Sequence, residues 1–150
     1  MTATADLIEG AFLTEEHRRL REGLAALQGS IAASHRLTRP EAIDDLARTL
    51  AWLRRDVLPH ASWEDAWLYP KLDHQAGTAW ATRALGLQHE QIRELAIDLE
   101  KVFEAAHERW SSDVAFSVVT AMARLDALIS SHLAQEERFI PNLLDSTDGS

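Results

Sequence analysis

The sequence His60-Ala61-Ser62-Trp63-Glu64 places a histidine and a glutamate four residues apart, and His132-Leu133-Ala134-Gln135-Glu136 repeats this spacing near the C-terminus. Residues four apart share one face of an α-helix. Both pairs lie in long stretches where apolar residues recur every three or four positions, which is typical of amphipathic helices. The pattern therefore predicts that both pairs face the interior of a helical protein.

Four long helices are predicted from this periodicity and from the residues that start or stop helices. Their expected ranges are about 14–33, 38–76, 78–110 and 112–144. Thr14 is expected to cap the first helix, and Pro40 suits the first turn of the second. The connections between the helices are short, which favours an all-α, antiparallel up-down-up-down four-helix bundle.

This bundle is expected to occupy residues 14–144, after a lead-in at 1–13 and before a polar, disordered tail at 145–150. Pro59 lies inside the second predicted helix. Because proline lacks the amide that would bond the carbonyl of Arg55, a kink is expected there.

The composition excludes several classes of function. The 150 residues suit one domain, and 24 acidic against 15 basic residues give a formal net charge of -9. That charge disfavours nucleic acid and anionic membranes as partners. Cysteine is absent, which excludes disulfides and thiolate metal ligands. No apolar run reaches the length of about 18 residues expected of a membrane span, and the N-terminus lacks a basic leader, so a cytoplasmic protein is expected.

Four of the seven histidines have mirrored spacings. The gaps between them are 43, 29 and 43 residues, for His17, His60, His89 and His132. In an antiparallel hairpin, two residues equally far from the turn lie at the same height. The midpoints of successive pairs fall at 38/39, 74/75 and 110/111, each at or just before a predicted helix break. The four histidines are therefore expected in one layer of the bundle.

The same spacings reveal an internal repeat of 72 residues. The segment from His17 to Glu22 matches the segment from His89 to Glu94 at its histidine, an apolar residue, an arginine and a glutamate. The His60–Glu64 and His132–Glu136 segments match in the same way. The chain is therefore expected to contain two copies of a helical hairpin, related by a pseudo-two-fold axis.

Four imidazoles and two carboxylates thus converge from four predicted helices. Inward histidines are often hydrogen-bonded core residues, but the mirrored spacings favour a metal site. Buried carboxylates are strongly disfavoured without compensation, and a pair of cations between them would supply it. Imidazole and carboxylate ligands without thiolate suit iron, manganese or zinc.

At these residues the chain resembles the hemerythrin-like family of HHE cation-binding domains, over about 14–144. The segment Leu58–Pro70 is similar to the family signature H-x-x-x-E-E-x-x-l-y-P, and His132–Pro141 resembles its second copy. The resemblance implies a non-haem centre of two iron ions with an oxo or hydroxo bridge. Glu64 and Glu136 would bridge the ions. One ion would take His17 and His60, and the other would take His89 and His132.

The sequence departs from the family at two places. Oxygen-carrying members have a fifth histidine where this chain has Arg93, whose repeat partner is Arg21. These arginines either pair with acidic neighbours at the edge of the bundle or polarise a bound ligand. Pro70 follows its histidine by ten residues, whereas Pro141 follows its histidine by nine. Glu137 therefore stays an alternative to Glu136 as the bridging residue.

The remaining aromatic residues and histidines carry weaker expectations. Trp67, Phe139 and Phe103 either wall an apolar pocket beside the metals or belong to the core, and Tyr69 is a further source of a hydroxyl near the site. The last three histidines, His35, His74 and His107, are expected to be exposed. His35 and His107 are expected at the end of the bundle opposite the site.

With two histidines per ion, each iron would keep an exchangeable position. The expected function is binding or reduction of a small oxidant, namely oxygen, hydrogen peroxide or nitric oxide. One alternative is an iron or oxygen sensor, or an iron reservoir, without turnover. Another is a di-iron oxidase that acts on an unidentified organic substrate. The sequence identifies no protein partner.

Overall fold

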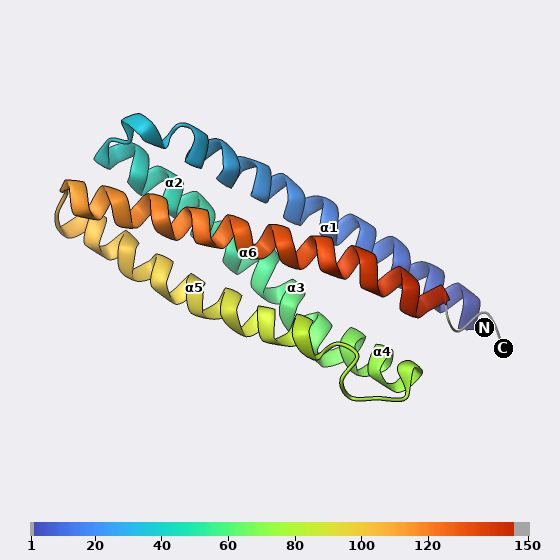
Figure 1. Cartoon of the computed structure of the whole chain (residues 1–150). Helices are drawn as coiled ribbons and strands as arrows, with labels where there is room; N and C mark the ends of the chain where they lie inside the picture. Colours follow the sequence, from blue (N-terminus) through green and yellow to red (C-terminus); the bar gives the residue numbers. More distant parts are fainter. Residues whose placement is uncertain (1, 146–150) are drawn as a thin grey trace.

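Long helices lie side by side along most of the chain in the computed structural model (Figure 1), which describes residues 2–145 and the side chains of residues 12–140. The α-helices are α1 (Thr2–Ala32), α2 (Arg39–Trp52), α3 (Leu58–Trp63), α4 (Tyr69–Ala76), α5 (Arg83–Glu108) and α6 (Ser112–Asp145). A short 3₁₀ turn, η1 (Ser34–Arg36), follows α1. Two π-helical turns, η2 (Leu53–Val57) and η3 (Glu64–Leu68), join α2, α3 and α4. The described residues contain no strand.

The helices form a bundle with connections at both ends. α6 packs against α5 and α1, and α2 packs against α5. Figure 1 shows the α1–α2 and α5–α6 connections at one end, and α4 with the loop 77–82 at the other. The described start of α1 and end of α6 also lie at that second end. The structure is therefore all-helical, as expected.

Two predicted helix starts are confirmed by their caps. Thr38 precedes α2, and its hydroxyl accepts a hydrogen bond from the amide of Glu41, whose carboxylate in turn accepts one from the Thr38 amide. Ser111 precedes α6, and its hydroxyl accepts a hydrogen bond from the amide of Val114 at 3.2 Å. Both starts follow from local residues alone, which is why the sequence predicted them.

Two other predicted helix starts are wrong. α1 begins at Thr2, so Thr14 lies inside the helix; Leu13 is buried in the core, which favours continuing the helix through this position. α5 begins at Arg83 because the carboxylate of Asp73 accepts hydrogen bonds at 2.9 Å from both the amide and the hydroxyl of Thr82. These bonds hold the preceding loop in a non-helical path. α4 ends at Gly77, whose φ of 72° favours glycine.

The predicted tail lies mostly outside the described residues. α6 extends to Asp145, which was expected to begin the tail, and residues 146–150 are not described. The midpoint expected at 74/75 is also displaced, because the chain reverses in the loop 77–82. α4 therefore continues past the expected midpoint, to Ala76.

The core consists of two apolar clusters. The larger cluster extends along the bundle and includes Leu24, Leu46, Leu99 and Met122. The smaller cluster lies toward the α4 end of the bundle and contains Leu13, Leu68, Tyr69, Leu72, Leu85 and Ile140. We call this second group the end cluster.

Close packing in the larger cluster depends on Gly23. A Cβ atom at this position would lie 2.0 Å from Nε1 of Trp52, well inside van der Waals contact. The Trp52 indole is buried, and its N–H has no hydrogen-bond partner within the described residues. Gly23 therefore allows α1 to approach the indole ring directly.

The helix α6 is both long and apolar. By length and composition alone it could span a membrane over Ser112–Ile140. In the structure its buried stripe packs into the larger cluster, through Val114, Val118, Met122, Leu125, Ile129 and Leu133. Its apolar character is therefore used in the core of the bundle.

The two π-helical turns accommodate Pro59 and Pro70. The amide of Leu58 bonds the carbonyl of Leu53, and the amide of Tyr69 bonds the carbonyl of Glu64, five residues earlier in each case. Each turn ends two residues before a proline, which cannot donate the usual helical bond. The distortion expected at Pro59 therefore takes the form of a wide turn inside a continuous helical segment.

The turn at Glu64–Leu68 also explains the unequal proline spacings. A π-helical turn holds one residue more than an α-helical turn. α6 remains α-helical throughout its described length, so it has no matching insertion. Residues before the turn keep an offset of 72 from their counterparts, whereas Pro70 and Pro141 are 71 apart. At this offset of 71 residues, the sequence pairs Tyr69 with Ile140.

Candidate metal centre

The structure brings all six predicted site residues together. α1 contributes His17, α3 contributes His60, η3 contributes Glu64, and α5 contributes His89, while α6 contributes His132 and Glu136. Both glutamates are 0% exposed, and the histidines are buried or nearly so. The helical periodicity and the mirrored spacings are sufficient to produce this layer.

Two groups of four residues share the two glutamates. One group is His17, His60, Glu64 and Glu136, and the other is Glu64, His89, His132 and Glu136. Within each group, one ligand atom per residue lies within 4.8 Å of all the others. We call these the first and second positions. Such an arrangement offers two adjacent positions for cations, with the two carboxylates between them.

The ring Nε2 atoms face the shared glutamates. Nε2 of His17 lies 2.8 Å from Glu136, and Nε2 of His132 lies 3.0 Å from the same carboxylate. Nε2 of His60 and Nε2 of His89 lie 3.1 and 3.3 Å from Oε1 of Glu64. Each glutamate is thus approached by one histidine from each position.

The opposite ring nitrogen, Nδ1, faces an outer oxygen on every histidine. His89 lies 2.7 Å from Asp65, and His132 lies 2.7 Å from Oε1 of Gln88. The corresponding contacts of the first position are longer, at 3.6 Å for His17 with Glu137 and 3.4 Å for His60 with Glu16. An acceptor at Nδ1 favours a proton there and leaves Nε2 free to bind a cation. These outer oxygens were not predicted.

Arg21 and Arg93 occupy matching places behind the histidines. Arg21 donates to Glu137 at 2.6 Å, and Arg93 donates to Asp65 at 2.6 Å. Both arginines therefore pair with acidic neighbours, as one of the two expectations stated. Because those carboxylates face His17 and His89, each arginine also holds the group that orients a histidine. Glu137 is accordingly an outer residue, and Glu136 faces the centre.

Tyr69 contributes a hydroxyl to the site. It donates a hydrogen bond to Oε2 of Glu136 at 2.6 Å and lies 3.3 Å from Nε2 of His89. Its ring stacks on that of His89, with centroids 5.2 Å apart and planes at 14°. The wide turn at Glu64–Leu68 brings this side chain inward, so simple helical periodicity gave only a weak signal for it.

Burial and neighbouring groups shift the pKa values of the two glutamates in opposite directions. Burial, followed by the adjacent Glu136 carboxylate, raises the pKa of Glu64 to about 12. Burial also acts to raise the pKa of Glu136, but hydrogen bonds with His132 and His17 outweigh it and lower that pKa. Without cations, the pair therefore carries one proton and one negative charge.

The tyrosine and two histidines stay neutral for the same reason. Burial is the largest influence on each of them. It lowers the pKa of His60 to about 4 and also lowers the pKa of His89, while it raises the pKa of Tyr69. Neutral imidazoles are the form that binds metals.

Several buried polar atoms have no hydrogen-bond partner within the described residues. They are both carboxylate oxygens of Glu64 and both ring nitrogens of His60. Their nearest polar neighbours lie at contact distance but without hydrogen-bond geometry. Unsatisfied buried groups of this kind are costly and call for an explanation. Cations placed between the glutamates would satisfy them, and nitrogen and oxygen donors fit first-row transition metals.

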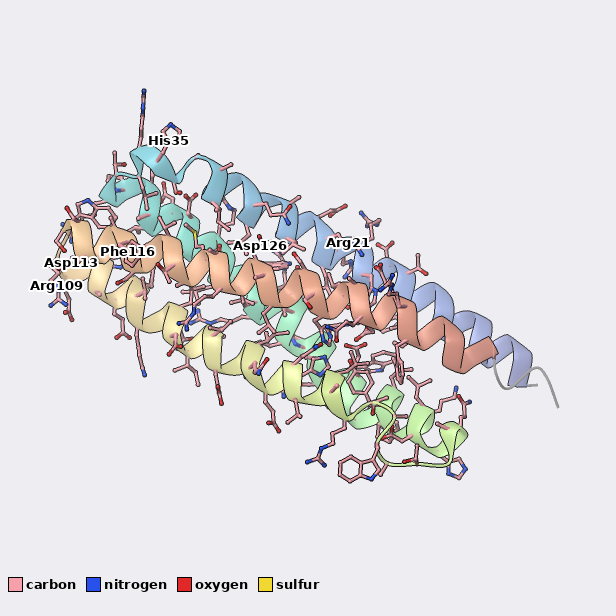
Figure 2. The ribbon with its side chains drawn as sticks, in the orientation of Figure 1. Arg21, His35, Arg109, Asp113, Phe116 and Asp126 are labelled. Carbon is pink, nitrogen blue, oxygen red and sulfur yellow. The ribbon has the colours of Figure 1, made fainter. Side chains whose placement is uncertain are left out.

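The remaining sequence expectations have mixed outcomes. Trp67 is 70% exposed and does not wall a pocket, because the wide turn rotates it outward. Phe139 packs beside the end cluster and Phe103 beside the larger cluster, so both belong to the core margin. His35, His74 and His107 are exposed, as expected. Figure 2 shows His35 at the end of the bundle where α1 leads into α2, far from Arg21.

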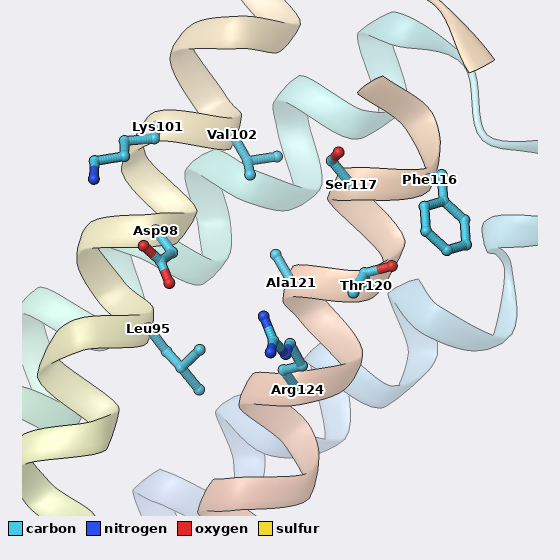
Figure 3. Close-up of a pocket in the computed structure, with 9 residues that line it drawn as sticks. All are labelled: Leu95, Asp98, Lys101, Val102, Phe116, Ser117, Thr120, Ala121 and Arg124. Atoms are coloured by element: carbon cyan, nitrogen blue, oxygen red, sulfur yellow. The ribbon is translucent and has the colours of Figure 1, made fainter. Parts of the chain in front are cut away.

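The surface clefts found among the described residues lie outside the cluster. One of about 340 Å³ lies between α5 and α6 and is lined by side chains that include Asp98, Lys101 and Arg124 (Figure 3). None of the six clustered residues lines it. A second cleft of about 300 Å³ is lined in part by Leu85 and Phe139, which also contribute to or pack against the end cluster.

Together, the helical fold and the His/Glu cluster define a metal-binding helical protein. The family model of the hemerythrin HHE cation binding domain matches residues 10–143, and the chain belongs to this family. Comparison with curated proteins and with solved structures gave no significant match.

Proposed function

We propose that this protein holds two iron ions between Glu64 and Glu136 and binds or reduces a small oxidant there, namely oxygen, hydrogen peroxide or nitric oxide. The observation that carries the proposal is the pair of four-residue groups that share these two glutamates. The proposal includes an up-down-up-down bundle built from two related hairpins. The recurrence of the histidine contacts at an offset of 72 residues supports that part.

The clustered residues would serve as metal ligands, and Tyr69 would serve as a hydrogen-bond donor. His17 and His60 would hold one ion and His89 and His132 the other, with the two glutamates bridging them. When bound, the ions would supply and accept the electrons. Tyr69 would direct its hydroxyl proton toward the second position, since it lies 2.6 Å from Glu136 and 3.3 Å from His89.

The surroundings of the site support a small substrate. The end cluster contributes Leu13, Leu68, Leu72, Leu85 and Ile140, and Tyr69 is its polar member among the described residues. Apolar side chains limit access of water and of large polar molecules. This environment favours a diatomic molecule or peroxide over an organic substrate.

Arg93 supports a second candidate, an iron sensor or reservoir without turnover. This residue stands where oxygen carriers of the family have a fifth histidine, and it is paired with Asp65. Fewer ligands would hold the ions less tightly. Loss of iron at low supply would suit a sensor.

The first test is metal content. Protein expressed with added iron should contain about two ions per chain and show the optical absorption of a bridged ferric pair. His60→Ala should lower the iron content, because it removes one of four histidine ligands. The matched control is His35→Ala, which removes an exposed histidine outside the cluster. Absence of metal, or a single zinc ion per chain, would overturn the proposal.

Rapid mixing of the reduced protein with each oxidant separates the candidates. A reversible adduct with oxygen indicates a carrier. Fast conversion to the ferric form, with consumption of oxidant in stoichiometric or catalytic amounts, indicates reduction. No reaction with any of the three oxidants, together with iron that dissociates readily, favours the sensor or reservoir.

A further inference from the structure

The outer oxygens around the two positions are not equivalent. Glu16 faces His60 at the first position, and Gln88 faces His132 at the second, and these outer residues lie 72 apart in the sequence. The other outer pair, Glu137 and Asp65, consists of two carboxylates. One carboxylate is therefore replaced by a neutral amide at the second position.

This replacement leaves the surroundings of the two positions with different charge. The first position has two outer carboxylates, Glu16 and Glu137, and one guanidinium, Arg21. The second has one outer carboxylate, Asp65, and one guanidinium, Arg93. Since the glutamates between the ions are shared, the first position is more negative by one formal charge.

A carboxylate and an amide that face Nδ1 differ in their effect on the basicity of the imidazole. Both accept a hydrogen bond and orient the ring, but a carboxylate also raises the basicity of the imidazole and attracts the cation beyond it. The Glu16 side chain is 21% exposed, so solvent screens it less than a surface charge. His60 should therefore donate more strongly to a cation than His132.

Hydrogen-bond lengths act in the opposite direction. The outer contacts of the second position are 2.7 Å each, against 3.4 and 3.6 Å at the first. Shorter contacts hold His89 and His132 better in place before an ion arrives. However, Glu16 and Glu137 need to move by less than about 1 Å to reach hydrogen-bonding distance. The full charge of Glu16 acts on a divalent ion whether or not it moves.

We infer that the two positions differ in affinity, and that the position formed by His17 and His60 binds its ion first and more tightly. The inference rests on the proposed function, since it requires two ions in the cluster. It gives Glu16 and Gln88 the role of positioning residues that act through His60 and His132. The ion at the second position, beside Tyr69, is then the one that exchanges.

The test is a titration of the metal-free full chain with Co²⁺ in the absence of oxygen, followed by calorimetry and optical absorption. We expect two steps whose dissociation constants differ by roughly 10–100-fold. Glu16→Gln should weaken the tighter step, and Gln88→Glu should strengthen the weaker one. The double variant should reverse the order of filling. The matched control is Glu15→Gln, which removes a neighbouring carboxylate paired with Arg18 on the exposed surface.

Single-histidine variants assign the steps. The tighter step should be lost in His60→Ala and kept in His132→Ala. Retention of the tighter step in His60→Ala would overturn the inference, as would Glu16→Gln and Gln88→Glu behaving like Glu15→Gln. Two ions bound with equal affinity by the unaltered protein would overturn this inference alone. Binding of fewer than two ions would overturn the proposed function itself.

Discussion

The hydroxyl of Tyr69 donates a 2.6 Å hydrogen bond to Glu136, a residue 67 positions away in the sequence. This bond links α4 to α6 at the point where the end cluster meets the candidate metal centre. It also gives Glu136 a partner that Glu64 lacks, since both oxygens of Glu64 are without a hydrogen bond within the described residues. The two glutamates therefore differ before any cation is bound.

Removal of this bond should weaken the metal-free fold. Tyr69→Phe deletes only the hydroxyl and removes a buried hydrogen bond to a charged carboxylate, so we expect a loss of about 1–3 kcal/mol in the free energy of unfolding. Urea denaturation of the chelator-treated protein measures it. Trp67→Phe is the control, because Trp67 is 70% exposed in the same segment. Equal effects of the two substitutions would contradict the assigned role of Tyr69.

Glu64→Gln should separate metal binding from stability. The amide keeps the size of the side chain but removes a bridging carboxylate, so the metal content should fall. The metal-free protein should keep its stability within about 1 kcal/mol, because the glutamine amide is neutral like the protonated Glu64 carboxyl group and can donate to Glu136 in its place. Leu46→Ala, at a fully buried position, should cost about 2–5 kcal/mol in the same assay. A comparable loss in Glu64→Gln would show that the carboxylate supports the fold.

Metal binding should stabilise the folded protein. A ligand present at about 100 times its dissociation constant adds about 2.7 kcal/mol per site. For a chain of this size, that corresponds to a rise in Tm of roughly 5–10 °C per ion. Calorimetric scans with and without iron measure the shift, and a chelator should reverse it. An unchanged Tm with saturating iron would argue against binding in the cluster.

Gly23→Ala should destabilise the bundle. The added methyl group would meet the Trp52 indole, and overpacking of this kind costs about 1–3 kcal/mol. Gly29→Ala lies in the same helix with nothing within 4 Å of the new Cβ, and it should gain up to about 1 kcal/mol from helix propensity. Thermal unfolding of the two variants should therefore shift in opposite directions. Equal shifts would mean that α1 and Trp52 can separate without cost.

The sequence predicted the layer of six residues because its information is local and periodic. Helical spacing turns His60 and Glu64 to one face, and the mirrored gaps place His17 and His89 at the same level. The caps at Thr38 and Ser111 were recognisable for the same reason. The start of α5 was not, since it depends on the contact of Asp73 with Thr82 nine residues away.

The outer contacts could not be predicted from one helix at a time. Asp65 faces His89 and Glu137 faces His17, each from a different helix, and the sequence alone gave no pairing between them. The hydroxyl of Tyr69 was expected near the site and lies there, whereas the exposed position of Trp67 was missed because one wide turn shifts the register. Uniform helical periodicity predicts the opposite orientation of these two rings.

The wide turn at Glu64–Leu68 also determines the polarity of the side chains around the candidate metal centre. Tyr69 corresponds to Ile140, so one half of the chain presents a phenol to the cluster and the other presents hydrocarbon. A single extra residue in a helical turn is thus enough to place one hydroxyl group beside the glutamates, within an otherwise apolar group of side chains.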